Sequence, residues 1–401
     1  MERKGSDDNS YYLYILPISG GGIVSHLALL QEVYDARLKA NNDIKGGYFS
    51  YAPHIVMGSS GGNISAFIAQ SADWTSDGIE RNVMHMNSEL FLKKWVPNEL
   101  PLIPNLPIGL LKGSLYNQGC GANSLFRRIF TSESIQRSEL WLGTYDIKHK
   151  KAQFFCNRNP SNSYISEPFF NEEQSLYFAR PLIFTGGDVD MLADISVASA
   201  TIPATVPSKE IKGLLYADGG VMYSSPFSVL HKEIMRIVTG KEKVPLSRSF
   251  QIENNSSENY EYIYSEDEIK EEKNLRLFYF FPYQPNGLEY PNKNKDLGIR
   301  TYLDSILNVS MIQDRNTAYE LINSLSPEGL ETETFIDLDS DRLSTIIKFL
   351  NTKKHYLICI FPHRNPSINI IHIDGESMRR EMKKVRQGYG CQVWYSKKEI
   401  N

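Results

Sequence analysis

The sequence has no long apolar run, and this absence excludes whole classes of protein. No stretch approaches the roughly 20 consecutive apolar residues that a membrane-spanning helix needs. Residues 1–10, MERKGSDDNS, are polar and lack the apolar core of a signal peptide, so we interpret them as a disordered tail. We expect a cytoplasmic or membrane-peripheral protein with no signal peptide and no transmembrane segment. Secretion without a cleaved signal stays open.

Cysteine and excess positive charge are also scarce. The four cysteines form no Cys-x-x-Cys pair, so we interpret Cys120, Cys156, Cys359 and Cys391 as buried thiols rather than disulfides or metal ligands. Asp and Glu (47) outnumber Lys and Arg (43), whereas a nucleic-acid-binding protein normally carries a basic stripe. The glycine-rich segments match neither phosphate-binding motif, G-x-G-x-x-G or G-x-x-x-x-G-K-[ST]. We expect no nucleic-acid partner, no metal and no cofactor.

Two glycine-rich loops organise the amino-terminal part of the chain. Residues 11–18, YYLYILPI, predict a buried strand, and three glycines follow before apolar residues recur at helical spacing from Ile23. The pattern repeats in residues 54–70, HIVMGSSGGNISAFIAQ, where a strand-like run and a helix-like run flank five small residues. Strand–loop–helix units in succession predict an α/β fold with a mostly parallel central sheet.

The second loop fits G-x-S-x-G, with Ser60 at the centre and Gly58 and Gly62 on either side. A nucleophilic serine on a sharp strand-to-helix turn needs small residues two positions before and after it, because larger side chains would collide across the turn. The following helix would direct its amino-terminal N–H groups and its dipole toward the hydroxyl. The plainer interpretation is a glycine-rich corner without chemistry, because this motif also arises by chance.

A serine nucleophile needs a base, and Asp218 is one candidate. It ends an apolar run and precedes Gly219 and Gly220, so we expect it at the carboxyl edge of a parallel sheet, where the sites of α/β proteins gather. Burial can raise the pKa of a carboxyl group toward neutrality and make it a base. The alternatives are a simple Asp-Gly turn and an α/β-hydrolase triad whose base is a late histidine such as His363.

Three successive glycines, Gly20, Gly21 and Gly22, form the third element. Without a Cβ, their backbone N–H groups can approach a ligand and form an oxyanion hole beside the serine. In this order, SGGGIVSH, GSSGG and YADGGVMYSSP resemble the patatin-like phospholipase family, and the resemblance extends over roughly residues 11–238.

The resemblance implies a three-layer patatin-like fold and a Ser–Asp dyad, with Ser60 as nucleophile and Asp218 as base. It implies a phospholipase A-type lipid acyl hydrolase that cleaves fatty-acyl esters of glycerophospholipids through an acyl-serine intermediate, without a cofactor. Three positions depart from the family pattern. A basic residue and a glycine usually follow the glycine loop, where this chain has Val24 and Ser25, and an asparagine often follows Asp-Gly-Gly, where it has Ser225. These departures raise the alternative of a catalytically weakened lipid- or protein-binding module.

We divide the chain into the tail, a patatin-like acyl hydrolase domain (11–325) and a C-terminal α/β extension (326–401). An acidic insertion (253–274) interrupts the domain. Residues 95–111 are apolar and suit either a lipid groove or core packing, whereas the basic RREMKKVR segment suits either anionic lipid or a solvated helix face. A phospholipid substrate and peripheral membrane contact are the expected partners, and a protein activator stays open.

Overall fold

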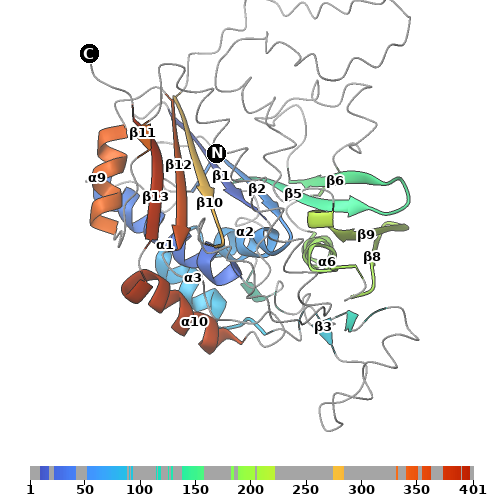
Figure 1. The fold of residues 1–401 in the computed structure, drawn as a ribbon. Coiled ribbons are helices and arrows are strands. Elements are labelled where there is room, and N and C mark those ends of the chain that lie inside the picture. The colour runs from blue at the N-terminus through green and yellow to red at the C-terminus, as the bar shows by residue number, and fades with distance from the viewer. Residues whose placement is uncertain are drawn as a thin grey trace, which may run out of the picture.

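The computed structural model describes a sheet of eleven strands with six α-helices packed against it (Figure 1). The described residues are 10–17, 22–41, 52–87, 90, 92–93, 114, 116–118, 125, 128–129, 138–157, 182–184, 188–203, 206–221, 274–283, 331–332, 340–350, 355–362, 374–389 and 391–397. The first strand begins at Ser10 and another at Asn274. The rest of the predicted tail and acidic insertion, and segment 95–111, lie outside these ranges.

The sheet is parallel at its centre and antiparallel toward its edges. Its order is β11 (Glu331–Thr332), β13 (Cys391–Lys397), β12 (His355–Pro362), β10 (Asn274–Phe280), β1 (Ser10–Leu16), β2 (Ile55–Ser59), β5 (Glu139–Asp146), β6 (Lys151–Cys156) and β7 (Leu182–Ile183). The strands β12, β10, β1, β2 and β5 run parallel to one another. Strand β9 (Leu214–Asp218) pairs antiparallel with β5 and with β8 (Lys209–Ile211). A separate pair consists of β3 (Leu92–Lys93) and β4 (Asn117–Gln118).

Both faces of the central strands are buried. In β1, Leu13 and Ile15 point to one face and Tyr14 and Leu16 to the other, and all four are at most 3% exposed. Parallel sheets require cover on both faces, which explains why their strands are continuous apolar runs. The sheet is therefore the middle of three layers, and the predicted α/β fold with a mostly parallel central sheet is confirmed.

Six helices share a hydrophobic core with one face of the sheet. They are α1 (Ile23–Asn41), α2 (Gly61–Ser71), α3 (Ser76–Val83), α6 (Val189–Ser199), α9 (Ser340–Leu350) and α10 (Gly375–Lys384). Helix α1 is the hub, because it packs against α2, α3, α9 and α10. None of the helices in the described part of the chain is long and apolar enough to cross a membrane.

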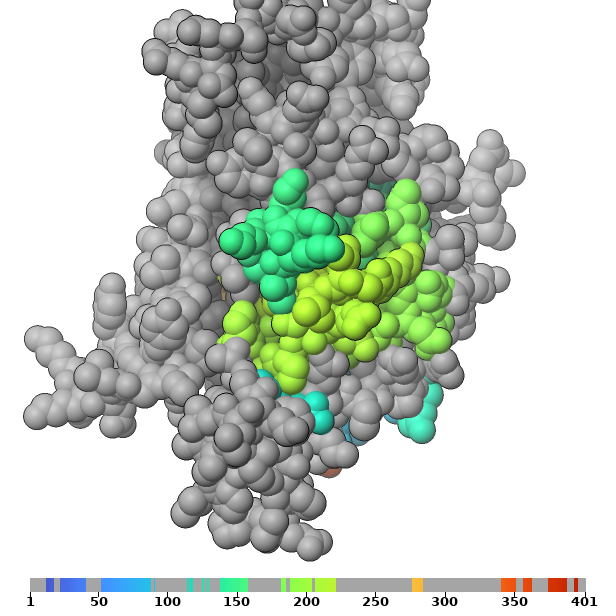
Figure 2. Space-filling view, turned by 90° about the vertical axis from the view of Figure 1, so that its right-hand side faces the viewer, coloured from blue at the N-terminus to red at the C-terminus, as the bar shows by residue number. Residues whose placement is uncertain are grey.

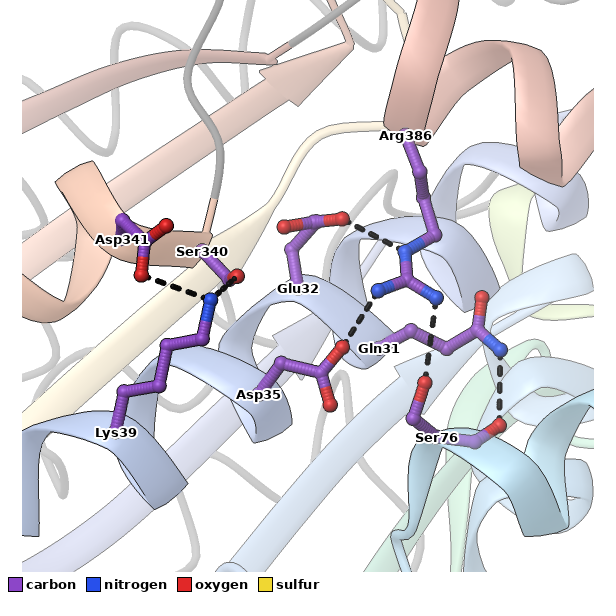
Figure 3. A network of polar contacts seen from close by, with 8 residues as sticks. All are labelled: Gln31, Glu32, Asp35, Lys39, Ser76, Ser340, Asp341 and Arg386. Carbon is purple, nitrogen blue, oxygen red and sulfur yellow. Dashed lines mark hydrogen bonds and ion pairs between the residues drawn. The ribbon is translucent and has the colours of Figure 1, made fainter. Parts of the chain in front are cut away.

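The C-terminal elements join the same sheet and the same helical layer. Strand β12 pairs with β10, and polar contacts fasten α1 to the C-terminal helices (Figure 3). Arg386, in a π-helical turn after α10, donates to Glu32 (2.7 Å) and Asp35 (2.5 Å) on α1, while Lys39 reaches Asp341 on α9 (2.8 Å). The proposed boundary at residue 325 lies outside the described ranges, so the division into two units stays a prediction.

Replacing Arg386 by glutamine is expected to lower the free energy of unfolding by about 2 kcal/mol, because two charge-assisted hydrogen bonds are lost where Glu32 is only 7% exposed. Urea denaturation measures the change. The matched control is Arg379→Gln, since the Arg379–Glu80 pair is 56% and 42% exposed and should contribute less than about 1 kcal/mol. Equal effects of the two changes would contradict the anchoring role of Arg386.

Candidate active site

Ser60 alone forms the turn between a strand and a helix. Strand β2 ends at Ser59 and α2 begins at Gly61. The backbone of Ser60 has φ 53° and ψ −128°, a conformation that residues with a side chain rarely adopt. Ser60 occupies the N-cap of α2, yet its side chain makes no capping hydrogen bond. Its hydroxyl is therefore free to point at a partner outside the helix.

The glycines on either side of this serine have a steric reason. A Cβ on Gly58 would lie 2.6 Å from Oδ1 of Asn63, and a Cβ on Gly62 would lie 2.0 Å from the carbonyl oxygen of Leu16. The absence of a side chain at Gly58 leaves room for Asn63 across the turn. The absence of one at Gly62 lets the start of α2 lie directly against the end of β1. The G-x-S-x-G spacing thus corresponds to two places where the backbone leaves no room for a side chain.

Asp218, the last residue of β9, lies beside Ser60, which follows β2. The Ser60 hydroxyl donates a 2.6 Å hydrogen bond to Oδ2 of Asp218, and the backbone N–H of Gly220 donates to Oδ1 (2.8 Å). Strand β5 brings them together, because Gly143 pairs with Ser59 of β2 and the next residue, Thr144, pairs with Asp218 of β9.

The strand that carries Asp218 differs from the prediction. We expected Asp218 at the carboxyl edge of a parallel sheet, and it lies beside the carboxyl end of β2, but its own strand β9 runs antiparallel to β5. The reason is that β5 continues for three residues beyond Gly143, the last residue that pairs with β2. The backbone of these three residues can therefore pair with a strand that runs in the opposite direction. Gly219 then passes close to β5, since a Cβ on it would lie 2.9 Å from the Gly143 carbonyl oxygen.

The environment of Asp218 favours its neutral form. The residue is 2% exposed. Burial raises the pKa of its carboxyl group from 3.8 to about 7, although the hydrogen bonds from Ser60 and Gly220 lower it. A carboxylate with a pKa near neutrality can accept a proton from a hydroxyl group that it already contacts, and can return that proton later.

Sequence reasoning missed Asn63, which ties the turn to its surroundings. The Asn63 amide donates to the carbonyl oxygen of Gly143 on β5 (3.0 Å) and to the hydroxyl of Ser199 on α6 (2.6 Å). The residue is fully buried. The available signal was a polar residue in the first turn of an otherwise apolar helix, directly after the candidate nucleophile. Asn63 therefore holds the start of α2 against the strand that aligns Ser60 with Asp218.

The glycine loop is described only at its end. Gly22 leads into α1, and a Cβ on it would lie 2.5 Å from Cβ of Pro282, so close packing requires glycine there. Gly20 and Gly21 lie outside the described residues, as does His363. Two of the departures from the family pattern, Val24 and Ser25, are fully buried in the first turn of α1, whereas Ser225 lies outside the described residues.

The described residues contain no group of three or more His, Cys, Asp and Glu side chains that could hold a metal ion. Cys156 and Cys359 are buried free thiols, as predicted, and burial raises the pKa of the Cys359 thiol. The groups assembled around Ser60 are thus a hydroxyl, a carboxyl, backbone N–H groups and an amide, which suit acyl transfer.

Comparison with known proteins bears on this arrangement. A family model described as Patatin-like phospholipase matches residues 16–231, a range that begins at the end of β1 and includes both Ser60 and Asp218. No curated protein matches the chain in a sequence search. Because the family match covers more than half of the 401 residues and agrees with the observed sheet, the chain belongs to the patatin-like phospholipase family.

Proposed function

We propose that the protein is a phospholipase A-type enzyme that hydrolyses fatty-acyl esters of glycerophospholipids on a Ser60–Asp218 dyad. The observation that carries the proposal is the 2.6 Å hydrogen bond from Ser60 to a buried carboxyl group. Membership of the family supports the substrate class, since it indicates hydrolysis of lipid acyl esters. The altered pKa of Asp218 supports its role as base.

In the proposed first step, Ser60 Oγ attacks the ester carbonyl carbon while its proton passes to Asp218. The negative charge on the carbonyl oxygen would be stabilised by N–H groups at the start of α2 and by the glycine loop, for which Gly20, Gly21 and Gly22 are the candidates. The tetrahedral intermediate then collapses, the bond to the leaving oxygen breaks, and Asp218 protonates the lysophospholipid that departs.

In the second step, a water molecule attacks the acyl-serine. Asp218 accepts a proton from this water as the new C–O bond forms, and the tetrahedral intermediate expels Ser60 Oγ. The serine recovers its proton from Asp218, and the fatty acid is released. One carboxyl group thus serves as base and acid in both halves of the reaction, so the proposed mechanism needs no histidine.

The test is fatty-acid release from mixed phospholipid vesicles, together with labelling by a fluorophosphonate, which reacts with activated serines. We expect Ser60→Ala to reduce release by about 10⁴-fold and to abolish labelling. The matched control is Ser59→Ala, a buried neighbour with no hydrogen bond to Asp218, which should keep both. Neither release nor labelling from wild type, even with cell extract as a source of activator, would favour the alternative of a catalytically weakened lipid- or protein-binding module.

A further inference from the structure

Two turns rich in lysine lie side by side on the face shown in Figure 2. One joins β5 to β6 and carries Lys148 and Lys150, and the other joins β8 to β9 and carries Lys212. Their proximity is fixed by the antiparallel pairing of β5 with β9, which the hydrogen bond from Ile147 N–H to the Leu215 carbonyl (3.0 Å) continues beyond the strand. Segments more than 60 residues apart in the sequence therefore form one surface.

This lysine face consists of Lys148, Lys150, Lys151, Lys212 and the exposed Leu215. Leu215 is 47% exposed, the largest exposed fraction among the large apolar side chains that the structure describes. Within the described part of the chain, no ion pair involves any of these four lysines. The surface combines uncompensated positive charge with an apolar side chain, in a protein whose net charge is −4.

Among the residues that the structure describes, the acidic groups of the two hairpins and of α6 leave this charge largely uncompensated. Asp194 forms a 2.7 Å ion pair with Lys209, which is not one of the four lysines. Asp146 is buried and contacts the ring of His149 (2.7 Å). Glu210 on β8 is exposed and is the acidic residue left to oppose the four lysines within these two hairpins. The lysine face is therefore strongly positive at neutral pH.

The geometry of both turns would suit other residues better. Lys150 (φ 55°) and Lys212 (φ 51°) adopt the left-handed conformation, which favours glycine and asparagine. Lys212 and Gly213 (φ 80°) form a two-residue hairpin turn of the type in which Asn-Gly is preferred. Asparagine or glycine would therefore fit the backbone of both turns better than lysine does.

The lysine face adjoins the candidate active site. Asp218 follows Leu215 by three positions on β9, which corresponds to about 10 Å along the strand. Strand β5 makes the same connection from the other turn, because it runs from Gly143, beside Ser59, to Asp146 at the start of the turn. The lysine face and the dyad are thus about 10 Å apart along β9, with the side chains of Leu215 and Asp218 on opposite faces of the strand.

We propose that the lysine face docks the protein on membranes that contain anionic phospholipid, with the lysines at the headgroups and Leu215 entering the interfacial region. Lysines within a Debye length of an anionic bilayer are each attracted to it, and an apolar side chain adds contact with the acyl boundary. The significance of this docking rests on the proposed function, since the substrate lies in such a surface. Binding itself requires no turnover.

The test uses the full chain with Ser60→Ala, so that vesicles are not consumed, and measures co-sedimentation with sucrose-loaded vesicles. Vesicles of phosphatidylcholine alone are compared with an equimolar mixture of phosphatidylcholine and phosphatidylserine. We expect binding to the mixture only, weakened by salt. Adding Lys150→Asn and Lys212→Asn should weaken it by about 30-fold, and asparagine suits both turns, so the fold is preserved.

The matched control removes two exposed lysines from helices at the other side of the molecule (Figure 1), by Lys348→Gln on α9 and Lys383→Gln on α10. Its binding should stay within about twofold of the parent. Equal losses in the two variants would overturn the proposal, because net charge or the basic segment of α10 would then explain binding. Binding of the parent to polyglutamate but not to phosphatidylserine would assign the face to an acidic protein instead. Because no outcome depends on hydrolysis, failure here is distinct from failure of the proposed enzyme.

Discussion

Replacing Asp218 by asparagine is expected to remove hydrolysis and to stabilise the folded protein at the same time. The asparagine has nearly the same shape and can keep a hydrogen bond with Ser60, but it cannot accept the serine proton. Loss of the base should lower kcat/KM by about 10⁴-fold, the scale seen when a catalytic carboxylate is replaced by an amide. Fatty-acid release under single-turnover conditions measures this loss, because acylation itself is then observed.

The gain in stability follows from the pKa of Asp218. The folded state holds this proton more tightly than the unfolded chain, with a pKa of about 7 against 3.8. The stability that protonation confers, roughly 4 kcal/mol, is therefore fully present below the unfolded pKa of 3.8 and is almost entirely lost as the pH rises through 7. Asparagine carries no charge and avoids this loss. Urea denaturation at pH 8 should show a variant more stable than wild type by up to this amount.

The comparison has an internal control. Asp341 on α9 is 78% exposed, so Asp341→Asn should change stability by less than about 1 kcal/mol at either pH. At pH 3, below both pKa values, Asp218 is largely protonated in the folded and the unfolded state, so the stabilising effect of Asp218→Asn should nearly vanish. An Asp218→Asn protein that is less stable than wild type at pH 8 would show that the carboxylate is satisfied by its hydrogen bonds, contrary to the burial argument.

Local patterns in the sequence predicted much of the fold. The strand–glycine–helix units around residues 11–34 and 54–70 were visible because a strand, its turn and its helix follow one another in the chain. The hairpin of β5 and β6 is local in the same sense, because a short turn joins its two strands in the chain. Gly58 and Gly62 could be identified because a tight turn imposes its steric demands within a few residues.

What depended on distant pairing could not be predicted. The apolar run HYLICIFP indicates a strand, but nothing local shows that β12 pairs with β10. The antiparallel course of β9 depends on how far β5 extends past Ser59, which is a property of the assembled sheet. The two amide contacts of Asn63 likewise join elements far apart in the chain. For the candidate site, the sequence therefore indicated which residue types carry the chemistry, but it did not indicate which distant residues they contact.

Hydrolysis by wild type is expected to depend on one ionisation near pH 7. Only ionised Asp218 can accept the proton of Ser60, so kcat/KM should rise about tenfold per pH unit below 7 and level off above it. Between pH 5 and pH 7 the expected increase is about 50-fold. The measurement is the pH dependence of fatty-acid release at substrate concentrations far below KM, which reports the ionisation of the free enzyme.

A histidine base would titrate in the same pH range, so the pH profile alone does not distinguish it from Asp218. A second measurement, the effect of organic solvent on the apparent pKa, is needed. Ionisation of a carboxylic acid creates two new charges, the carboxylate and the hydronium ion. Deprotonation of an imidazolium leaves the number of charges unchanged, because the positive charge moves to the hydronium ion. Added organic solvent should therefore raise the apparent pKa if Asp218 is the group, and leave it nearly unchanged for a histidine. His363→Gln should retain the profile and the rate. A midpoint insensitive to solvent, together with activity lost in that variant, would replace the dyad by the triad of an α/β-hydrolase.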